Sequence, residues 1–196
     1  MTDAHEQIEH AEHVEHAAHA NKGIALLISV LALFLALSET LGKSAQTTAI
    51  SDNVRASDTW AFYQAKTIRS SALQIASQAM TIESGATGDP KVKEAQGKQI
   101  DVWKKESARL DDEPGKEGRK QLMDRANQAE EDRDLALARY HHYETSSAAF
   151  QIGIVLASAT IITGMTILAW ISGGLGVVGL VFMGIGLFAP HAVHLV

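Results

Sequence analysis

The stretch that decides the fold is residues 23–41, which read GIALLISVLALFLALSETL. A helix needs roughly 20 mostly apolar residues to cross the hydrocarbon core of a bilayer. This stretch reaches that length with Glu39 in its last turn. No small-residue cleavage site follows it, so we expect a retained transmembrane helix over residues 23–42 rather than a signal peptide.

The C-terminal part of the chain is apolar as well. Residues 146–171 and 175–189 contain no Asp, Glu, Lys or Arg, and Ser172, Gly173 and Gly174 separate the two tracts. Each tract is long enough to cross a bilayer, and a short connection favours an antiparallel pair. The sequence therefore predicts transmembrane helices over 147–171 and 174–190, a turn at 172–174, and a short C-terminal end over 191–196.

The region between these tracts, residues 43–146, is polar and rich in helix-forming residues. Residues 85–90 (GATGDP) and 111–118 (DDEPGKEG) contain glycine and proline, which end helices and start new ones. We expect an extramembrane domain of three helices, over about 46–84, 91–110 and 119–146. Since nothing breaks the pattern after Arg119, the third should continue directly into the second transmembrane helix.

A seven-residue repeat marks the first of these three helices. Its members are Val54, Ala61, Ile68, Ile75 and Ile82, with Ala65, Ala72 and Ala79 between them. A seam that repeats every 3.5 residues and alternates alanine with a larger side chain is typical of closely packed antiparallel helices. The predicted fold is therefore an all-α membrane protein, in which three transmembrane helices carry a long antiparallel, coiled-coil-like extramembrane domain.

Composition excludes several classes of function. The net charge of −6 argues against nucleic-acid binding, which requires a basic surface. The absence of cysteine excludes disulfides and thiolate chemistry. No phosphate-binding glycine loop, nucleophile elbow or zinc-protease motif is present, so we predict no catalytic residues and a protein that is not an enzyme.

Small residues lie at helical spacing in the two C-terminal tracts. Ala149, Gly153 and Ala157 form one stripe, and Gly176 and Gly184 lie on one face of the last helix. Small side chains let helix backbones approach each other in lipid. We expect these residues to pack helices together, either within one chain or between copies.

The N-terminal tail, residues 1–22, is rich in histidine and glutamate, with His10, His13, His16 and His19 three residues apart. Imidazole and carboxylate groups bind zinc, copper and nickel, and imidazole also titrates near neutral pH. A three-residue step, however, turns successive side chains about 60° around the helix, so four imidazoles do not converge on one ion. The alternatives are a divalent-metal or pH-sensing site and a solvated or interfacial helix that leads into the membrane and holds no cofactor.

Glu39 is an ionisable residue inside a predicted transmembrane helix, and such residues are functional candidates. It also lies in the last turn, with Lys43 four residues on, so the alternative to an ion or proton pathway is an interfacial carboxylate that is paired with Lys43 or solvated.

A cluster on the first extramembrane helix comprises Trp60, Tyr63, Gln64 and Lys66. Aromatic residues on a helix usually belong to a core, and the alternative here is a contact surface for another helix or subunit.

The segment NVRASDTWAFYQAKTIR, residues 53–69, together with the preceding apolar helix and the later FQIGIVLASATIITG segment, resembles the bacterial family called domain of unknown function 4337. The positions that carry the resemblance are Asn53, Ala56, Asp58, Trp60, Tyr63, Gln64, Ala65 and Lys66. The resemblance extends from about residue 23 to residue 186. It implies a bacterial membrane protein of this layout and brings no known activity.

We therefore expect a membrane-anchored helical scaffold that self-associates or binds another membrane protein. The alternatives are metal or proton handling by the tail and an oligomeric channel. Three transmembrane helices place the tail on one side of the membrane and the extramembrane domain on the other. Basic residues near the membrane, Lys43, Arg55 and Arg139, favour a cytoplasmic extramembrane domain at a bacterial inner membrane.

Overall fold

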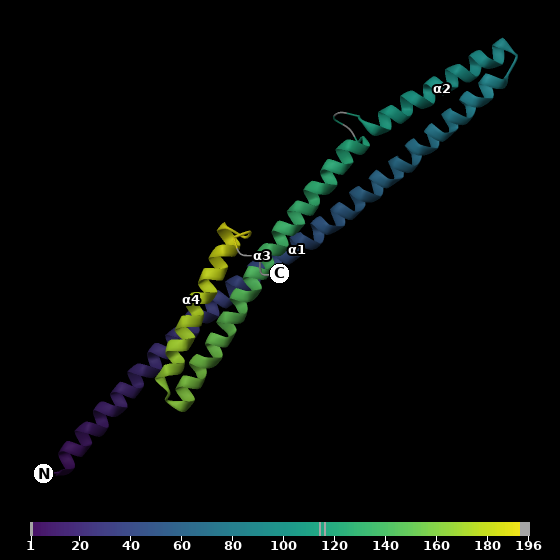
Figure 1. The fold of residues 1–196 in the computed structure, drawn as a ribbon. Helices are drawn as coiled ribbons and strands as arrows, with labels where there is room; N and C mark the ends of the chain where they lie inside the picture. Colours follow the sequence, from purple (N-terminus) through teal and green to yellow (C-terminus); the bar gives the residue numbers. More distant parts are fainter. Residues whose placement is uncertain (1, 114, 116, 193–196) are drawn as a thin grey trace. The chain divides into compact units, whose positions relative to one another are not determined.

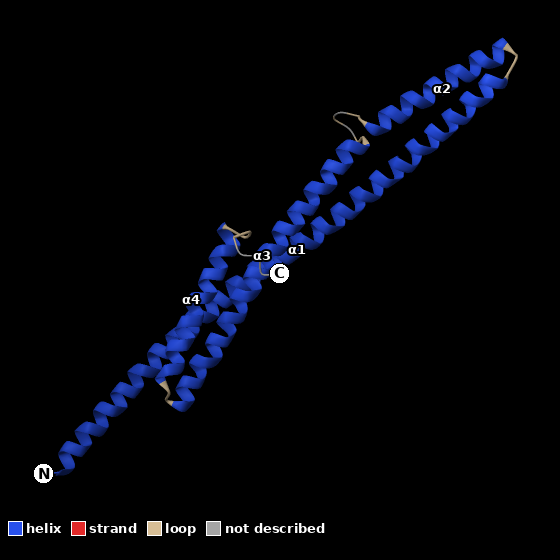
Figure 2. Ribbon diagram, viewed as in Figure 1, coloured by secondary structure: helices blue, strands red, loops and turns tan. Residues whose placement is uncertain are grey.

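The computed structural model describes the backbone of residues 2–113, 115 and 117–192, and the side chains of residues 22–113, 115 and 117–192. Within these ranges every regular element is a helix (Figure 2). The helices are α1 (Thr2–Ala86), α2 (Pro90–Asp111), α3 (Arg119–Thr163) and α4 (Thr166–Phe188) (Figure 1). The all-helical prediction is confirmed, and three of the helices (α1, α3 and α4) contain stretches long and apolar enough to cross a membrane.

The chain divides into two compact units. Unit 1 comprises residues 1–48 and 135–196, and unit 2 comprises residues 49–134. Helices α1 and α3 each contribute residues to both units. Helix α3 runs without a break from Arg119 to Thr163, as the pattern after Arg119 predicted.

Both predicted breaks in unit 2 are present. Before α2, the side chain of Asp89 accepts a hydrogen bond from the backbone N–H of Lys91 at 2.9 Å, and Pro90 occupies the first turn, where its missing N–H costs nothing. After α2, Gly115 has a φ of 76° between Asp111 and Arg119. Glycine adopts this left-handed conformation without steric cost, which turns the chain toward α3.

The turn predicted at 172–174 is wrong. These residues lie inside α4, and the connection is at Gly164 and Met165. Gly164 has a φ of 68°, and its N–H donates to the carbonyl of Thr160 at 2.9 Å, as in a glycine helix terminus. The second apolar helix therefore ends at Thr163 instead of 171, and the third begins at Thr166 instead of 174.

In unit 1 the residues of α1, α3 and α4 pack closely because small side chains lie where the helices meet. Phe150 on α3 is fully buried against Gly179 and stacks on Phe34 of α1, with ring centroids 6.0 Å apart. Leu31 of α1 lies against Gly153 and Gly176. Glycine leaves the space that Leu31 and Phe150 fill, so the helices pack closely around these two side chains.

Three buried serines add hydrogen bonds between the helices of unit 1. Ser38 donates to the Tyr143 carbonyl at 3.0 Å, Ser146 to that of Gly179 at 2.8 Å, and Ser172 to that of Gly153 at 2.7 Å. In an apolar environment these bonds fix helix pairs that hydrophobicity alone would leave free to slide.

Unit 2 buries a different face of α1 from the one predicted. The isoleucine repeat is exposed, with Ile68, Ile75 and Ile82 at 71%, 67% and 77% of full accessibility. The buried face follows a second seven-residue repeat of small residues, whose members are Ala49, Ala56, Ser70, Ser77 and Ser84.

The residues that cover this second repeat come from α2 and α3. Ser70 and Ser107 are hydrogen-bonded through their hydroxyls at 2.9 Å. Apolar residues of the two helices complete the core, namely Ile100, Leu110, Leu122, Ala126 and Ala129. The partner helices bring hydroxyls and close alanine contacts, so serine and alanine fit this interface better than isoleucine.

Candidate functional site

The predicted contact cluster lies largely inside unit 2. Trp60 donates its indole N–H to the Glu130 carboxylate at 2.8 Å and meets the Tyr63 ring edge to face, with centroids 5.4 Å apart. The Lys66 ammonium donates to the Glu117 carbonyl. Gln64 is exposed. Trp60 therefore joins α1 to α3, and Lys66 joins α1 to the residues that precede α3. Gln64 alone of the four is exposed.

Ion pairs surround this contact. Arg55 binds Asp132 at 2.6 Å, and Arg69 binds Glu106 at 3.2 Å. The hydrogen bond and charge of Arg109 hold the pKa of Glu106 below its ordinary value. These pairs are exposed, so each contributes little to stability. Together they fix which charged side chains of the helices in unit 2 lie opposite one another.

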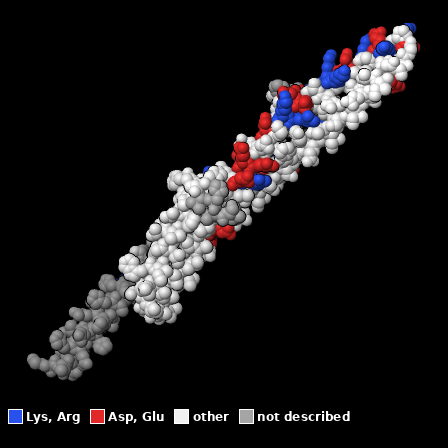
Figure 3. Space-filling view, viewed as in Figure 1, with Lys and Arg blue, Asp and Glu red and all other residues white. Residues whose placement is uncertain are grey.

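The two units differ in their content of charged residues. Lys, Arg, Asp and Glu side chains gather over unit 2 in the space-filling view (Figure 3). In the described part of unit 1 the charged residues are Lys22, Glu39, Lys43, Arg139 and Glu144. Unit 1 instead exposes large apolar side chains, among them Leu26, Leu33, Val155 and Trp170. Such a surface is unfavourable in water and suits a lipid environment.

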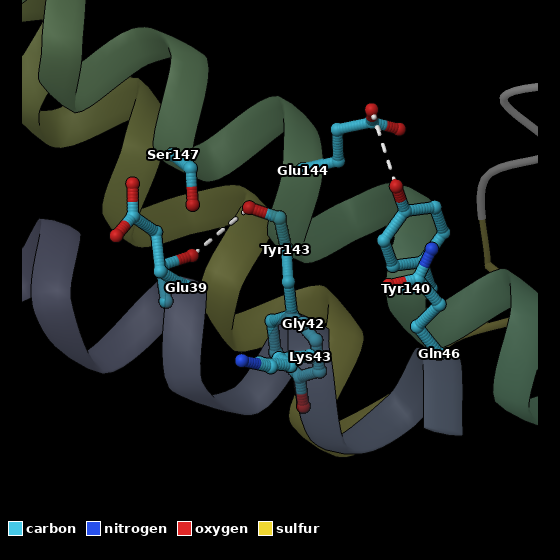
Figure 4. Close-up of a pocket in the computed structure, with 9 residues that line it drawn as sticks. Glu39, Gly42, Lys43, Gln46, Tyr140, Tyr143, Glu144 and Ser147 are labelled. Carbon is cyan, nitrogen blue, oxygen red and sulfur yellow. Dashed lines mark hydrogen bonds between the residues drawn. The ribbon is translucent and has the colours of Figure 1, made fainter. Parts of the chain in front are cut away.

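Glu39 lines a groove of unit 1 with a volume of about 310 Å³ (Figure 4). The groove is lined by Ser38, Glu39, Gly42, Lys43, Gln46, Tyr140, Tyr143, Glu144 and Ser147. The Glu39 carboxylate accepts from the Gln151 amide at 3.2 Å, and the Tyr140 hydroxyl donates to Glu144 at 3.4 Å. Among the described residues Glu39 has no ion pair with Lys43, so the predicted pairing is absent. The carboxylate is tied to α3 instead.

The four histidines predicted as metal ligands, His10, His13, His16 and His19, lie outside the residues whose side chains are described. Within the described residues no three His, Asp or Glu side chains converge on a point that could hold a metal ion.

Four of the five predicted packing residues are buried. Ala149 and Ala157 are buried, and Gly153 and Gly176 lie against Leu31. Gly184 does not pack, because a Cβ added there would meet no atom within 4 Å. Gly186, two residues on, lies against Tyr143 and His142 and takes the role expected of Gly184.

His142 is a buried polar group on α3. It is 1% exposed, its ring nitrogen Nε2 donates to the Pro190 carbonyl at 3.0 Å, and its ring stacks on Phe182. This contact joins α3 to the residues after α4. The pair of histidines at 141–142 gave no signal of it, because the partner lies 48 residues along the chain.

The most distinctive exposed feature of unit 2 is the isoleucine repeat on α1. Three isoleucines more than two-thirds exposed lie on one face of a helix whose opposite face is the core. The intervening alanines, Ala65, Ala72 and Ala79, are exposed as well. An uncharged apolar stripe of this kind is a candidate interaction surface.

Comparisons with known proteins add a family and no activity. Residues 20–189 match the family described as Domain of unknown function (DUF4337). No curated protein and no solved structure matches the chain.

Proposed function

The chain belongs to this family of unknown function, and we propose that it is a non-enzymatic, membrane-anchored helical scaffold that binds a protein partner through the exposed face of α1 in unit 2. The observation that carries the proposal is the uncovered isoleucine repeat. Ile68, Ile75 and Ile82 are exposed although α1 has a core face of its own. Leaving such side chains in water is unfavourable, and a partner that covers them removes that cost.

The anchor in this proposal is unit 1. Stretches of α1, α3 and α4 have the length and composition of transmembrane helices, and the outward side chains of unit 1 are apolar. Its buried serines and glycines follow the packing chemistry of helices in lipid. The resemblance and the positions of Lys43, Arg55 and Arg139 favour a bacterial inner membrane with unit 2 in the cytoplasm.

A photo-crosslinking experiment in native membranes tests this function. A photoreactive amino acid replaces Ile75 in one variant and Val102 in another. Val102 is the matched control, because it is 57% exposed on α2 and lies off the isoleucine repeat. The proposal predicts a discrete crosslinked species of defined mass from position 75 and none from position 102. Equal, diffuse labelling from both positions would contradict it.

Anchoring is tested on the same membranes. The chain should stay with the membrane through an alkaline carbonate wash and leave it only with detergent. Release by the wash would refute a membrane-spanning unit 1.

A further inference from the structure

The exposed face of α1 has the geometry of one half of a coiled coil. Its residues are separated by alternating steps of four and three, and we call them the Ile–Ala seam: Ala61, Ala65, Ile68, Ala72, Ile75, Ala79 and Ile82. All seven are exposed. The seam spans about 32 Å at about 1.5 Å per residue, and no charged residue interrupts it.

This spacing specifies the shape of the partner. Side chains that repeat every 3.5 residues insert into holes on a facing helix that has the same repeat. A globular protein surface or a flat lipid surface does not offer such holes. The partner is therefore a helix with an apolar seven-residue repeat.

We propose that the partner is a second copy of this chain, with the two Ile–Ala seams packed against each other. The proposal rests on the docking function above and names its partner. The chain itself presents a seam of the required period and length, and all seven of its residues are exposed.

The residues that flank the seam permit this pairing. Gln64, Ser71 and Gln78 lie on one side, and Arg69, Ala76 and Glu83 lie on the other. In a parallel pair, each residue of the first set faces the residue five positions later in the other copy. Glutamine then faces Arg69 or Glu83, and serine faces Ala76. No like charges meet, so nothing along the edges opposes a second copy.

Membrane anchoring determines the direction of the two seams. Two copies inserted the same way in one bilayer both leave it near Gly42, so their seams begin from the same end. The helices then run parallel and in register. Ala65, Ala72 and Ala79 each face their own counterparts, and these small layers let the backbones approach between the isoleucine layers.

Disulfide crosslinking tests the pairing directly, because the chain has no cysteine of its own. The variants Ala72→Cys and, as control, Val102→Cys are placed in liposomes at low protein density and oxidised. Facing positions of a parallel pair meet the distance that a disulfide requires, so Ala72→Cys should give at least about fivefold more covalent dimer than the control. Ala65→Cys and Ala79→Cys should behave like Ala72→Cys. Circular dichroism checks that each variant keeps its helicity.

A mixture of Ala65→Cys and Ile82→Cys chains tests the direction. Parallel seams give only like-with-like dimers, whereas mixed dimers alone would overturn the parallel pairing. Dimer yields no higher than that of Val102→Cys at all three alanine positions would overturn the second copy as partner. If the photoreactive group at position 75 then still captures a different protein in native membranes, the docking function survives without this inference. If it captures nothing, both fail.

Discussion

Phe150 and Gly179 form the closest large-to-small contact between α3 and α4. Phe150 is fully buried, and a Cβ added at Gly179 would come within 2.7 Å of its ring. Gly179→Ala therefore forces the ring or the helix to move, and should lower the unfolding free energy of unit 1 by about 1–3 kcal/mol. Denaturation by SDS in mixed micelles measures it.

The matched control for this contact is Gly184→Ala, on the same helix in open space. Its effect should stay within about 0.5 kcal/mol. Equal losses from both variants would mean that helix propensity, rather than the fit around Phe150, determines the result.

A second prediction concerns the buried hydroxyl of Ser172. Ser172→Ala removes its 2.7 Å hydrogen bond to the Gly153 carbonyl and should destabilise unit 1 by about 0.6–1.7 kcal/mol, as for other interhelical bonds in membrane proteins. Ser29→Ala removes a hydroxyl that bonds only within α1, so it should change the same denaturation midpoint much less. An unchanged midpoint for Ser172→Ala would show that this hydrogen bond does not stabilise unit 1.

A third prediction concerns which of the two seven-residue repeats of α1 faces the core of unit 2. Ile75→Ala removes an exposed side chain and should change stability by less than about 0.5 kcal/mol in detergent-solubilised monomers. Leu122→Ala, at a position 4% exposed, should cost about 2–5 kcal/mol. The reverse order in thermal unfolding would restore the isoleucine repeat as the core of unit 2.

A fourth prediction follows from the carboxylates of unit 2. Arg109 lowers the pKa of Glu106, and hydrogen bonds from Gln121 and Lys120 lower that of Asp112. A carboxylate with a lowered pKa contributes stability that is present above its unfolded pKa and is lost as pH falls through the folded one. Stability should therefore fall as pH drops below the ordinary values of 4.5 and 3.8.

The variant Glu106→Gln should flatten part of this acid dependence, followed by helicity in detergent between pH 6 and 2. Glu131→Gln, at another exposed carboxylate, is the control. A pH profile of Glu106→Gln that superimposes on the wild type would rule out Glu106 as a contributor.

Local signals in the sequence predicted the helices and their breaks in unit 2. Asp89 and Pro90 start α2 by their own chemistry, and Gly115 turns the chain within the connection after it, so neighbours in the sequence were sufficient. The turn between α3 and α4 was misplaced because Gly173 and Gly174 resemble a break, whereas Gly164 is one glycine in an uncharged tract. Only its backbone conformation distinguishes it.

The choice of core face on α1 could not be predicted from α1 alone. Hydrophobicity ranks the isoleucine repeat above the repeat that contains Ser70 and Ser77. The deciding groups lie on other helices, since Ser107 bonds Ser70 and Glu130 bonds Trp60. The partners of the predicted contact cluster could not be predicted from α1 for the same reason. Trp60 and Lys66 bind residues of unit 2 that lie far along the chain, Glu130 and Glu117.

The central claim is that a partner covers the Ile–Ala seam in the membrane. Maleimide labelling of Ile75→Cys in open native membrane fragments and after solubilisation to monomers tests it most directly, with Val102→Cys labelled in parallel. The account predicts that Ile75→Cys is protected in the membrane and becomes reactive on solubilisation, while Val102→Cys reacts in both. Equal labelling of Ile75→Cys in the two states would contradict it.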